Sequence, residues 1–231
     1  DAGHNLLLRM DYRNSSDVRE YRVQQTIKDC YGGAAGELGA RELCQHLKQK
    51  IDAREVYAWQ LDHVFEALFE VQPLVALDEF MLTACEDDDD PIYGGIGLSR
   101  RSPLEKITPS ILWGWTDLDP AVRYPLVSRS LNIFAIKNLD DDIGLSPLFL
   151  EGLERSPDRA AYLGNNVARL HPSGWSGHLS AILDRRRSWL EPLKHHRDED
   201  VKAWAMARSA DLQRHADHER KRESEREESF E

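Results

Sequence analysis

Apolar residues recur at three- and four-residue steps through almost the whole chain after residue 34, and this period constrains the fold more than any other feature. In residues 40–51, Leu43, Leu47 and Ile51 follow one another at four-residue steps, with polar residues between them. Such a period places all of these side chains on one face of an α-helix. The sequence therefore predicts an all-α fold.

A repeated pattern of helices extends over the second half of the chain. Each copy begins with a polar helix cap, followed by proline or an acid in the first turn and then by an aromatic residue. Asp119 and Ser156 are expected caps, because their side chains can bind free N–H groups at the start of a helix. The equivalent residues Pro120, Pro157 and Glu199 lie 37 and 42 residues apart, and another helical segment precedes each copy. Helix pairs at this spacing are typical of a HEAT- or armadillo-like α-solenoid, here of about five or six helix pairs. The three copies are residues 117–131, 154–170 and 196–212.

Composition divides the chain into four segments. Residues 86–103 hold four aspartates, three glycines and two prolines and are expected to form a long loop, without the ligand spacing of an EF-hand. A second acidic run at 139–144 is likewise expected to be a solvated turn. Pro73 should divide the apolar stretch before the loop into two helices. The segments are N-terminal helical repeats in 1–85, the loop in 86–103, HEAT-like helical repeats in 104–213, and a charged C-terminal helix or tail in 214–231.

Charge and cysteine content limit the partners and the compartment. The formal net charge is -11, so the surface as a whole repels nucleic acid and anionic membranes. No apolar run approaches the roughly 20 residues that span a bilayer. Cys30, Cys44 and Cys85 form no CxxC pair, which favours reduced thiols in a cytoplasmic protein. Because the chain starts at Asp1 without a methionine, we expect it to be a fragment of a longer one.

The stretch HPSGWSGHLSAILDRRRSWLEP, residues 171–192, resembles catalytic and phosphate-binding loops only superficially. It lacks the lysine of a phosphate-binding loop and the Gly-x-Ser-x-Gly spacing of a nucleophile elbow. The structural interpretation is that Trp175 packs inward and Ser176 caps the next helix. The three arginines at 185–187 then lie on a solvated face with one of them salt-bridged to the neighbouring repeat, or alternatively contribute to partner binding.

Two pairs of histidines are the best candidates for metal ligands in the sequence. His215 and His218 lie three residues apart with Glu219 beside them, and His195 and His196 are adjacent. The first pair falls on the charged C-terminal segment with no second set of ligands nearby, so we expect solvated histidines. No acid, base and nucleophile occur together, so the sequence predicts no metal, no cofactor and no catalysis in this region.

The chain has six tryptophans, including Trp175 of the stretch described above, and each could be a core or a contact residue. Trp59, Trp189 and Trp204 fall on apolar helical rows and are expected in the core. Trp113 and Trp115 straddle Gly114, and residues two apart do not share a helix face, so one of them could face a partner. The best candidate contact residues are Trp113, Arg123 and Arg129, because they lie near the corner of a helix pair.

Four segments of the second half of the chain together carry a family resemblance. They are WTDLDPAVRYPLVSRSLNIF, HPSGWSGHLSAILDRRRSWLEPL, HRDEDVKAWA and HERKRESEREESFE. Over about residues 105–231 it resembles the C-terminal helical repeats of bacterial STAND-type (NACHT-like) NTPases and related antiphage defence proteins. The resemblance implies that these repeats sense a ligand, often a phage protein, while NTPase and effector domains lie upstream. The chain itself has no Walker lysine loop.

We therefore expect a protein-recognition α-solenoid, the sensor portion of a larger defence NTPase. Its partner would be a phage protein or the upstream domains of the same chain, and the acidic surface favours a basic patch on that partner. Two alternatives stay open. The repeats could be a structural scaffold for packing or self-assembly, or they could carry an enzyme site that no motif shows.

Overall fold

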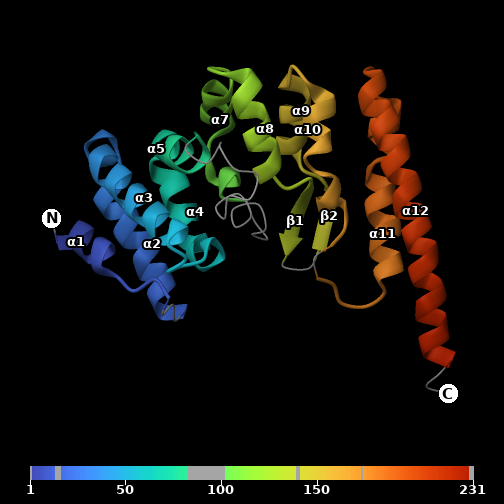
Figure 1. Ribbon diagram of the computed structural model, residues 1–231, viewed down its shortest axis with the longest axis horizontal. Coiled ribbons are helices and arrows are strands. Elements are labelled where there is room, and N and C mark those ends of the chain that lie inside the picture. Colours follow the sequence, from blue (N-terminus) through green and yellow to red (C-terminus); the bar gives the residue numbers. More distant parts are fainter. Residues whose placement is uncertain (1, 14–16, 83–101, 139–140, 173, 229–231) are drawn as a thin grey trace. The chain divides into compact units, whose positions relative to one another are not determined.

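A computed structural model of the chain describes residues 2–13, 17–82, 102–138, 141–172 and 174–228. These form two compact units, residues 1–131 and 132–231, whose helices and strands are labelled in Figure 1. The division falls inside the segment 104–213 that the sequence treats as one array of repeats. The predicted loop 86–103 lies outside the described residues up to residue 101, and so does Cys85.

The described residues of unit 1 form helices and the turns that connect them, without a strand. Pro73 ends one helix and begins the next, as predicted, because a proline fits the first turn of a helix but not its interior. The elements are α1 (Ala2–Arg9), α2 (Asp17–Tyr31), α3 (Glu37–Asp52), α4 (Asp62–Val71), α5 (Pro73–Leu77), α7 (Pro109–Thr116) and α8 (Pro120–Ser130), with the short turns η1 (Ala34–Gly36), η2 (Ala58–Leu61), η3 (Asp78–Leu82, π-helical) and η4 (Pro103–Lys106) between them.

The core of unit 1 lies between helices α2 to α5. The predicted stripe of α3, Leu43, Leu47 and Ile51, is fully buried there. The side chains of Phe65 and Phe80 meet edge to face with their centroids 5.0 Å apart, a favourable arrangement for aromatic pairs. The helical period thus correctly identified the buried face.

Gly36 sets how closely the chain can turn between α2 and α3. A Cβ atom at this position would lie 2.3 Å from the Cα atom of Tyr31, inside the backbone of the preceding helix. Only a residue without a side chain allows this approach. The turn lets α3 fold back so that it packs against α2.

Unit 2 begins with a β-hairpin that the sequence analysis did not predict. Strands β1 and β2 pair in antiparallel fashion, with Phe134 opposite Leu145 and irregularities farther along the ladder. The expected acidic turn at 139–144 is therefore wrong over 141–144, which belongs to a strand. The remaining elements are helical. The unit comprises β1 (Phe134–Asn138), β2 (Asp141–Leu145), α9 (Pro147–Arg155), α10 (Arg159–Gly164), η5 (Val167–Leu170), α11 (Leu179–Trp189), η6 (Glu191–His195) and α12 (Glu199–Glu228).

The helix pairs of the predicted repeats are present, although the solenoid arrangement itself stays a prediction. The pairs are α7 with α8, α9 with α10, and α11 with α12. Asp119 caps α8 as expected, whereas Asp158 rather than Ser156 caps α10 by accepting a hydrogen bond from Ala161 N. The hairpin intervenes between the second helix of the first pair and the first helix of the next.

Helix α12 is the longest element of unit 2, with 30 residues, and it lies beside α11 (Figure 1). Of the two possibilities for the segment after residue 213, extension of the last helix is the one observed, as far as Glu228. One buried stripe runs along α12 at helical spacing and packs on the rest of the unit; its members are Val201, Ala205, Ser209, Leu212, Ala216 and Glu219.

One arginine of the run on α11 binds the segment that precedes this helix pair, but through a backbone carbonyl and not through the expected salt bridge. Arg186 is only 9% exposed, and its Nη1 donates a hydrogen bond of 3.1 Å to the carbonyl of Leu170. Its guanidinium carbon also lies 4.8 Å from the ring centroid of Phe134 in β1. The Phe134 ring in turn lies against Trp189, which is half-buried as Trp204 is. Arg186 thus ties the end of η5 and the hairpin to α11.

No helix among the described residues is both long and apolar enough to cross a membrane.

Substitution of two glycines by alanine should change the stability of unit 1 in opposite directions. Gly36→Ala forces the turn away from Tyr31 and should cost about 1–3 kcal/mol of unfolding free energy, as overpacking does. At Gly114 in α7, no described atom lies within 4 Å of an added Cβ, so Gly114→Ala should stabilise the helix by roughly 0.5–1 kcal/mol. Urea unfolding followed by tryptophan fluorescence measures both changes. Equal stability of the two variants would contradict the close approach at Gly36.

Replacement of Arg186 tests how much its buried hydrogen bond to the Leu170 carbonyl stabilises unit 2. Arg186→Met keeps most of the apolar stem but leaves the buried Leu170 carbonyl without this donor, so unit 2 should lose about 1–3 kcal/mol of stability. The neighbouring Arg185 is exposed, and Arg185→Met is the matched control with a smaller loss. Thermal unfolding of the two variants distinguishes loss of the buried hydrogen bond from a general effect of removing positive charge from α11. Equal losses for both variants would indicate the charge effect.

Candidate functional site

The predicted contact residues lie at the corner between α7 and α8. Trp113 is only 1% exposed, and its ring stacks on Tyr124 of α8 with centroids 6.2 Å apart. A side chain this deeply buried cannot touch a partner in the folded protein, so Trp113 is a core residue and not a contact residue. Arg123 is half-buried, and Arg129, also half-buried, lies six residues farther along α8.

Arg123 packs on its own unit. Its Nη1 donates to the carbonyl of Trp115 at 2.8 Å, and its guanidinium carbon lies 4.4 Å from the centroid of the Trp115 ring. Trp115 is itself buried, and its indole N–H donates to Asp78 at 2.8 Å. Both tryptophans of α7 are therefore inside, since α8 covers one side of the short helix while the π-helical turn η3 supplies a polar partner on the other. The binding role of Arg123 and Arg129 stays a prediction.

A stacked pair of aromatic side chains lies on the surface of unit 1. Tyr57 and Trp59 are 58% and 63% exposed, and their rings stack nearly parallel, with centroids 6.4 Å apart and an interplanar angle of 12°. The expectation that Trp59 belongs to the core is therefore wrong. Ala58 and Leu61, on either side of Trp59, are the residues buried in this turn.

The end of α3 explains why the aromatic pair faces outward. Arg54 adopts a left-handed backbone conformation with φ of 57°, which terminates the helix although no glycine is present. The helical row that would have placed Trp59 inward is thereby interrupted. The short turn η2 follows and is fixed by a hydrogen bond of 2.9 Å from Tyr57 N to the Gln60 side chain. The two rings thus project from an anchored turn.

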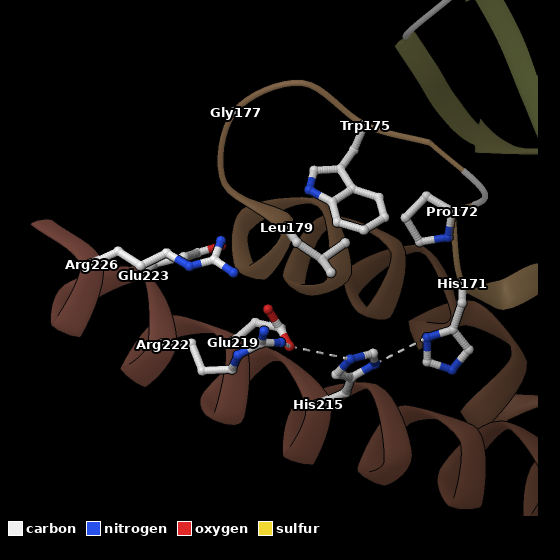
Figure 2. Close-up of a pocket in the computed structure, with 10 residues that line it drawn as sticks. All are labelled: His171, Pro172, Trp175, Gly177, Leu179, His215, Glu219, Arg222, Glu223 and Arg226. Carbon is white, nitrogen blue, oxygen red and sulfur yellow. Dashed lines mark hydrogen bonds and ion pairs between the residues drawn. The ribbon is translucent and has the colours of Figure 1, made fainter.

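Unit 2 contains a pocket of about 370 Å³ between the loop before α11 and the C-terminal half of α12 (Figure 2). The loop contributes an indole and a histidine, and α12 contributes a histidine, two glutamates and two arginines. The lining residues are His171, Pro172, Trp175, Gly177, Leu179, His215, Glu219, Arg222, Glu223 and Arg226.

The loop over this pocket departs from its predicted packing. Trp175 is 52% exposed and lies over the pocket, so the expectation that it packs inward is wrong (Figure 2). Gly177 has a φ of 78°, a conformation that favours glycine and lets the chain turn into α11. Helix α11 begins at Leu179 with His178 in the capping position, so Ser176 is not its cap.

A carboxylate from α12 binds the start of α11 instead. Glu223 accepts hydrogen bonds from the backbone N–H of Ser180 at 3.2 Å and from the Ser180 hydroxyl at 2.5 Å, and His178 lies 3.4 Å from the same carboxylate. A negative charge here compensates the free N–H groups and the positive end of the helix dipole. Burial raises the pKa of Glu223, but the hydrogen bonds from Ser180 more than offset this and hold the pKa below its ordinary value.

Two histidines from distant parts of the sequence meet at the other end of the pocket. The Nδ1 atoms of His171 and His215 are 3.2 Å apart, and the Nε2 atom of His215 lies 3.8 Å from Glu219 (Figure 2). Glu219 is also paired with Arg222 at 2.7 Å. Burial, with a smaller contribution from His215, lowers the pKa of His171, so the neutral imidazole is favoured.

The arrangement provides charged and aromatic binding groups. The two arginines and two glutamates of the lining balance in formal charge, and an exposed indole face lies beside them. His215 lies on α12 and is half-buried rather than fully solvated, whereas His218 is exposed as expected. Within the described part of the chain, no group of three or more histidine, cysteine, aspartate or glutamate side chains is placed to hold a metal.

Comparisons with protein-family models, with curated proteins and with solved structures find no significant match to this chain.

Sequence reasoning could have found half of this pocket. Glu219 and Glu223 continue the stripe of Leu212 and Ala216 at helical spacing, and His215 is the residue before Ala216, so this face of α12 continues with polar residues. The other half comes from the loop, and no periodicity predicts where His171 and Trp175 lie.

Removal of the Glu223 carboxylate should destabilise unit 2. Glu223→Ala should cost about 1–2 kcal/mol, as the loss of other helix caps does, because Ser180 loses both hydrogen bonds. Glu225→Ala, two residues along the same helix, is the control, since its side chain is largely exposed. Urea unfolding at neutral pH measures the difference.

The pH dependence of this difference follows from the lowered pKa. The stabilisation by Glu223 should be complete above the ordinary glutamate pKa and should disappear as the pH falls through the lower pKa of the folded state. A difference between wild type and Glu223→Gln that persists unchanged in strong acid would exclude the charged cap.

Proposed function

We propose that the chain is a helical protein-recognition module whose contact surface is centred on Tyr57 and Trp59. The observation that carries this proposal is the exposed aromatic pair itself. Folding leaves more than half of each ring in water although the neighbouring Ala58 and Leu61 are buried.

An exposed pair of this kind suits a binding surface for two physical reasons. Tryptophan and tyrosine bury large areas with few rotatable bonds, which makes them the commonest residues of interface hot spots. The two rings already stack on one another, so little conformational entropy remains to be lost when a partner covers them. Capping of the turn by Gln60 further limits their motion.

Charge indicates the kind of partner. With a formal net charge of -11, the chain attracts a protein whose binding face is basic and repels nucleic acid. The family resemblance supports a place in a larger bacterial defence NTPase, where the helical repeats would form a solenoid that senses a phage protein. The cytoplasm is the compartment this proposal requires.

Trp59→Ala should weaken partner binding by more than about 2 kcal/mol, or about 30-fold in Kd, as hot-spot truncations do. It should leave the thermal unfolding temperature nearly unchanged, since the side chain is exposed. The partner is first captured with the full chain from lysates of infected and uninfected cells and identified by mass spectrometry. Its affinity for wild type and variants is then measured with purified proteins.

Trp175→Ala is the matched control, because it removes a second tryptophan of similar exposure from the other unit. Weakened binding for Trp59→Ala with normal binding for Trp175→Ala supports the proposal. Normal binding for Trp59→Ala overturns it. Self-association of the chain without any external partner, detected by sedimentation, would instead favour the scaffold alternative.

A further inference from the structure

We propose that His171 and His215 form a binding site for a divalent transition-metal ion, Zn²⁺ being the physiological choice, at the inner end of the pocket in unit 2. This inference is independent of the proposed protein-recognition surface, which belongs to unit 1. It rests on the approach of two ring nitrogens that the fold brings together from positions 44 residues apart.

The distance between the two nitrogens matches a shared metal ion. Two histidine ligands at the usual Zn–N distance and a tetrahedral angle place their nitrogens about 3.3 Å apart. The Nδ1 atoms of His171 and His215 are 3.2 Å apart. An ion could therefore bind between them without a rearrangement of either backbone segment.

The orientation of the two rings also supports a shared metal ion. Their centroids are 5.0 Å apart, which is 1.8 Å more than the distance between the nitrogens. Two rings pointing straight at each other would add two full ring radii, which is more than this difference. The rings are therefore bent to one side of the contact, as two ligands that converge on an ion are.

Glu219 selects the ring nitrogen of His215 that can bind a metal. Its carboxylate lies 3.8 Å from Nε2 of His215, which is beyond hydrogen-bond distance, and its negative charge favours a proton on that atom over one on Nδ1. The lone pair of Nδ1 then faces His171. A carboxylate behind a ligating histidine is the common arrangement in zinc sites, where it fixes the ring and strengthens the ligand.

Without an ion, His171 must supply the proton between the two nitrogens. The contact is then an N–H···N hydrogen bond from His171 to His215. When an ion binds, both Nδ1 lone pairs become ligands, and the His171 proton moves through solvent to Nε2 of the same ring. The neutral imidazoles therefore keep their net charge, and no other reactant is needed.

The remaining coordination positions face the open pocket. Two protein ligands leave two tetrahedral positions for water or for donors of a bound molecule, one more than the single open position of a catalytic zinc site with three protein ligands. Imidazole ligands suit zinc, copper and nickel better than magnesium or calcium, which prefer oxygen. Arg222 and Arg226 oppose a cation, but the carboxylates of Glu219 and Glu223 balance their charge.

Titration of the metal-free full chain with Zn²⁺ in a calorimeter tests the site, with thermal unfolding as a second measurement. Wild type should bind one ion and unfold at a higher temperature as zinc is added, because the ligand binds only the folded state. His171→Gln and His215→Gln should each weaken binding at least tenfold and lose the thermal shift. Glu219→Gln should weaken it about tenfold, as outer partners of metal ligands do.

His218→Gln is the matched control, since His218 lies on the same helix but is exposed and outside the pocket. It should bind zinc as wild type does. Nitrogen-15 spectra of the histidines give an independent measurement, because zinc should shift the Nδ1 resonances of His171 and His215 and not those of His218. Circular dichroism with a chelator present establishes that each variant is folded.

Three results would overturn the proposal. They are the absence of zinc binding to folded wild type at hundreds of micromolar, unchanged binding when both histidines are replaced, and ligation through Nε2 instead of Nδ1. In the first case the contact is only the hydrogen bond between the two rings.

Discussion

The packing face of α12 determines where unit 2 has a solid core and where it has a pocket. Through Ala216 this face is small or apolar and holds the helix against its neighbours, whereas from Glu219 onward it is polar. Polar groups on a packing face need partners, and Glu223 finds them in the N–H and hydroxyl of Ser180. The pocket lies where the face changes character, because the long polar side chains and the loop opposite them do not fill the space between the helices.

Two charged side chains fix the loop that closes this pocket. Arg186 binds the carbonyl of Leu170 just before the loop, and Glu223 binds the N–H of Ser180 just after it. The segment between them, which carries His171 and Trp175, is therefore held at both ends while its middle lies at the surface. This explains how the loop can expose the indole of Trp175 and still hold Nδ1 of His171 3.2 Å from Nδ1 of His215, which lies 44 residues later in the sequence.

The sequence predicted the helices of the fold better than the exposure of individual side chains and the pairing of the strands. Helical periodicity identified the buried stripe of α3 and the division at Pro73, because both depend on local geometry. It failed at Trp59, where a left-handed Arg54 shifts the phase of the helical row. It also failed at the hairpin, since the acidic residues of 141–144 resemble a turn and the pairing with β1 depends on contacts outside the segment.

The sequence by itself determined that the chain is mainly helical, which face of α3 is apolar, and that no familiar catalytic or nucleotide-binding motif is present, because these follow from spacing along one segment. Only the tertiary structure decided that Trp113 is buried while Trp59 and Trp175 are exposed, and that His171 meets His215. The reason is physical: exposure and proximity depend on which distant segments pack on a residue, and a single helical period carries no information about its neighbours.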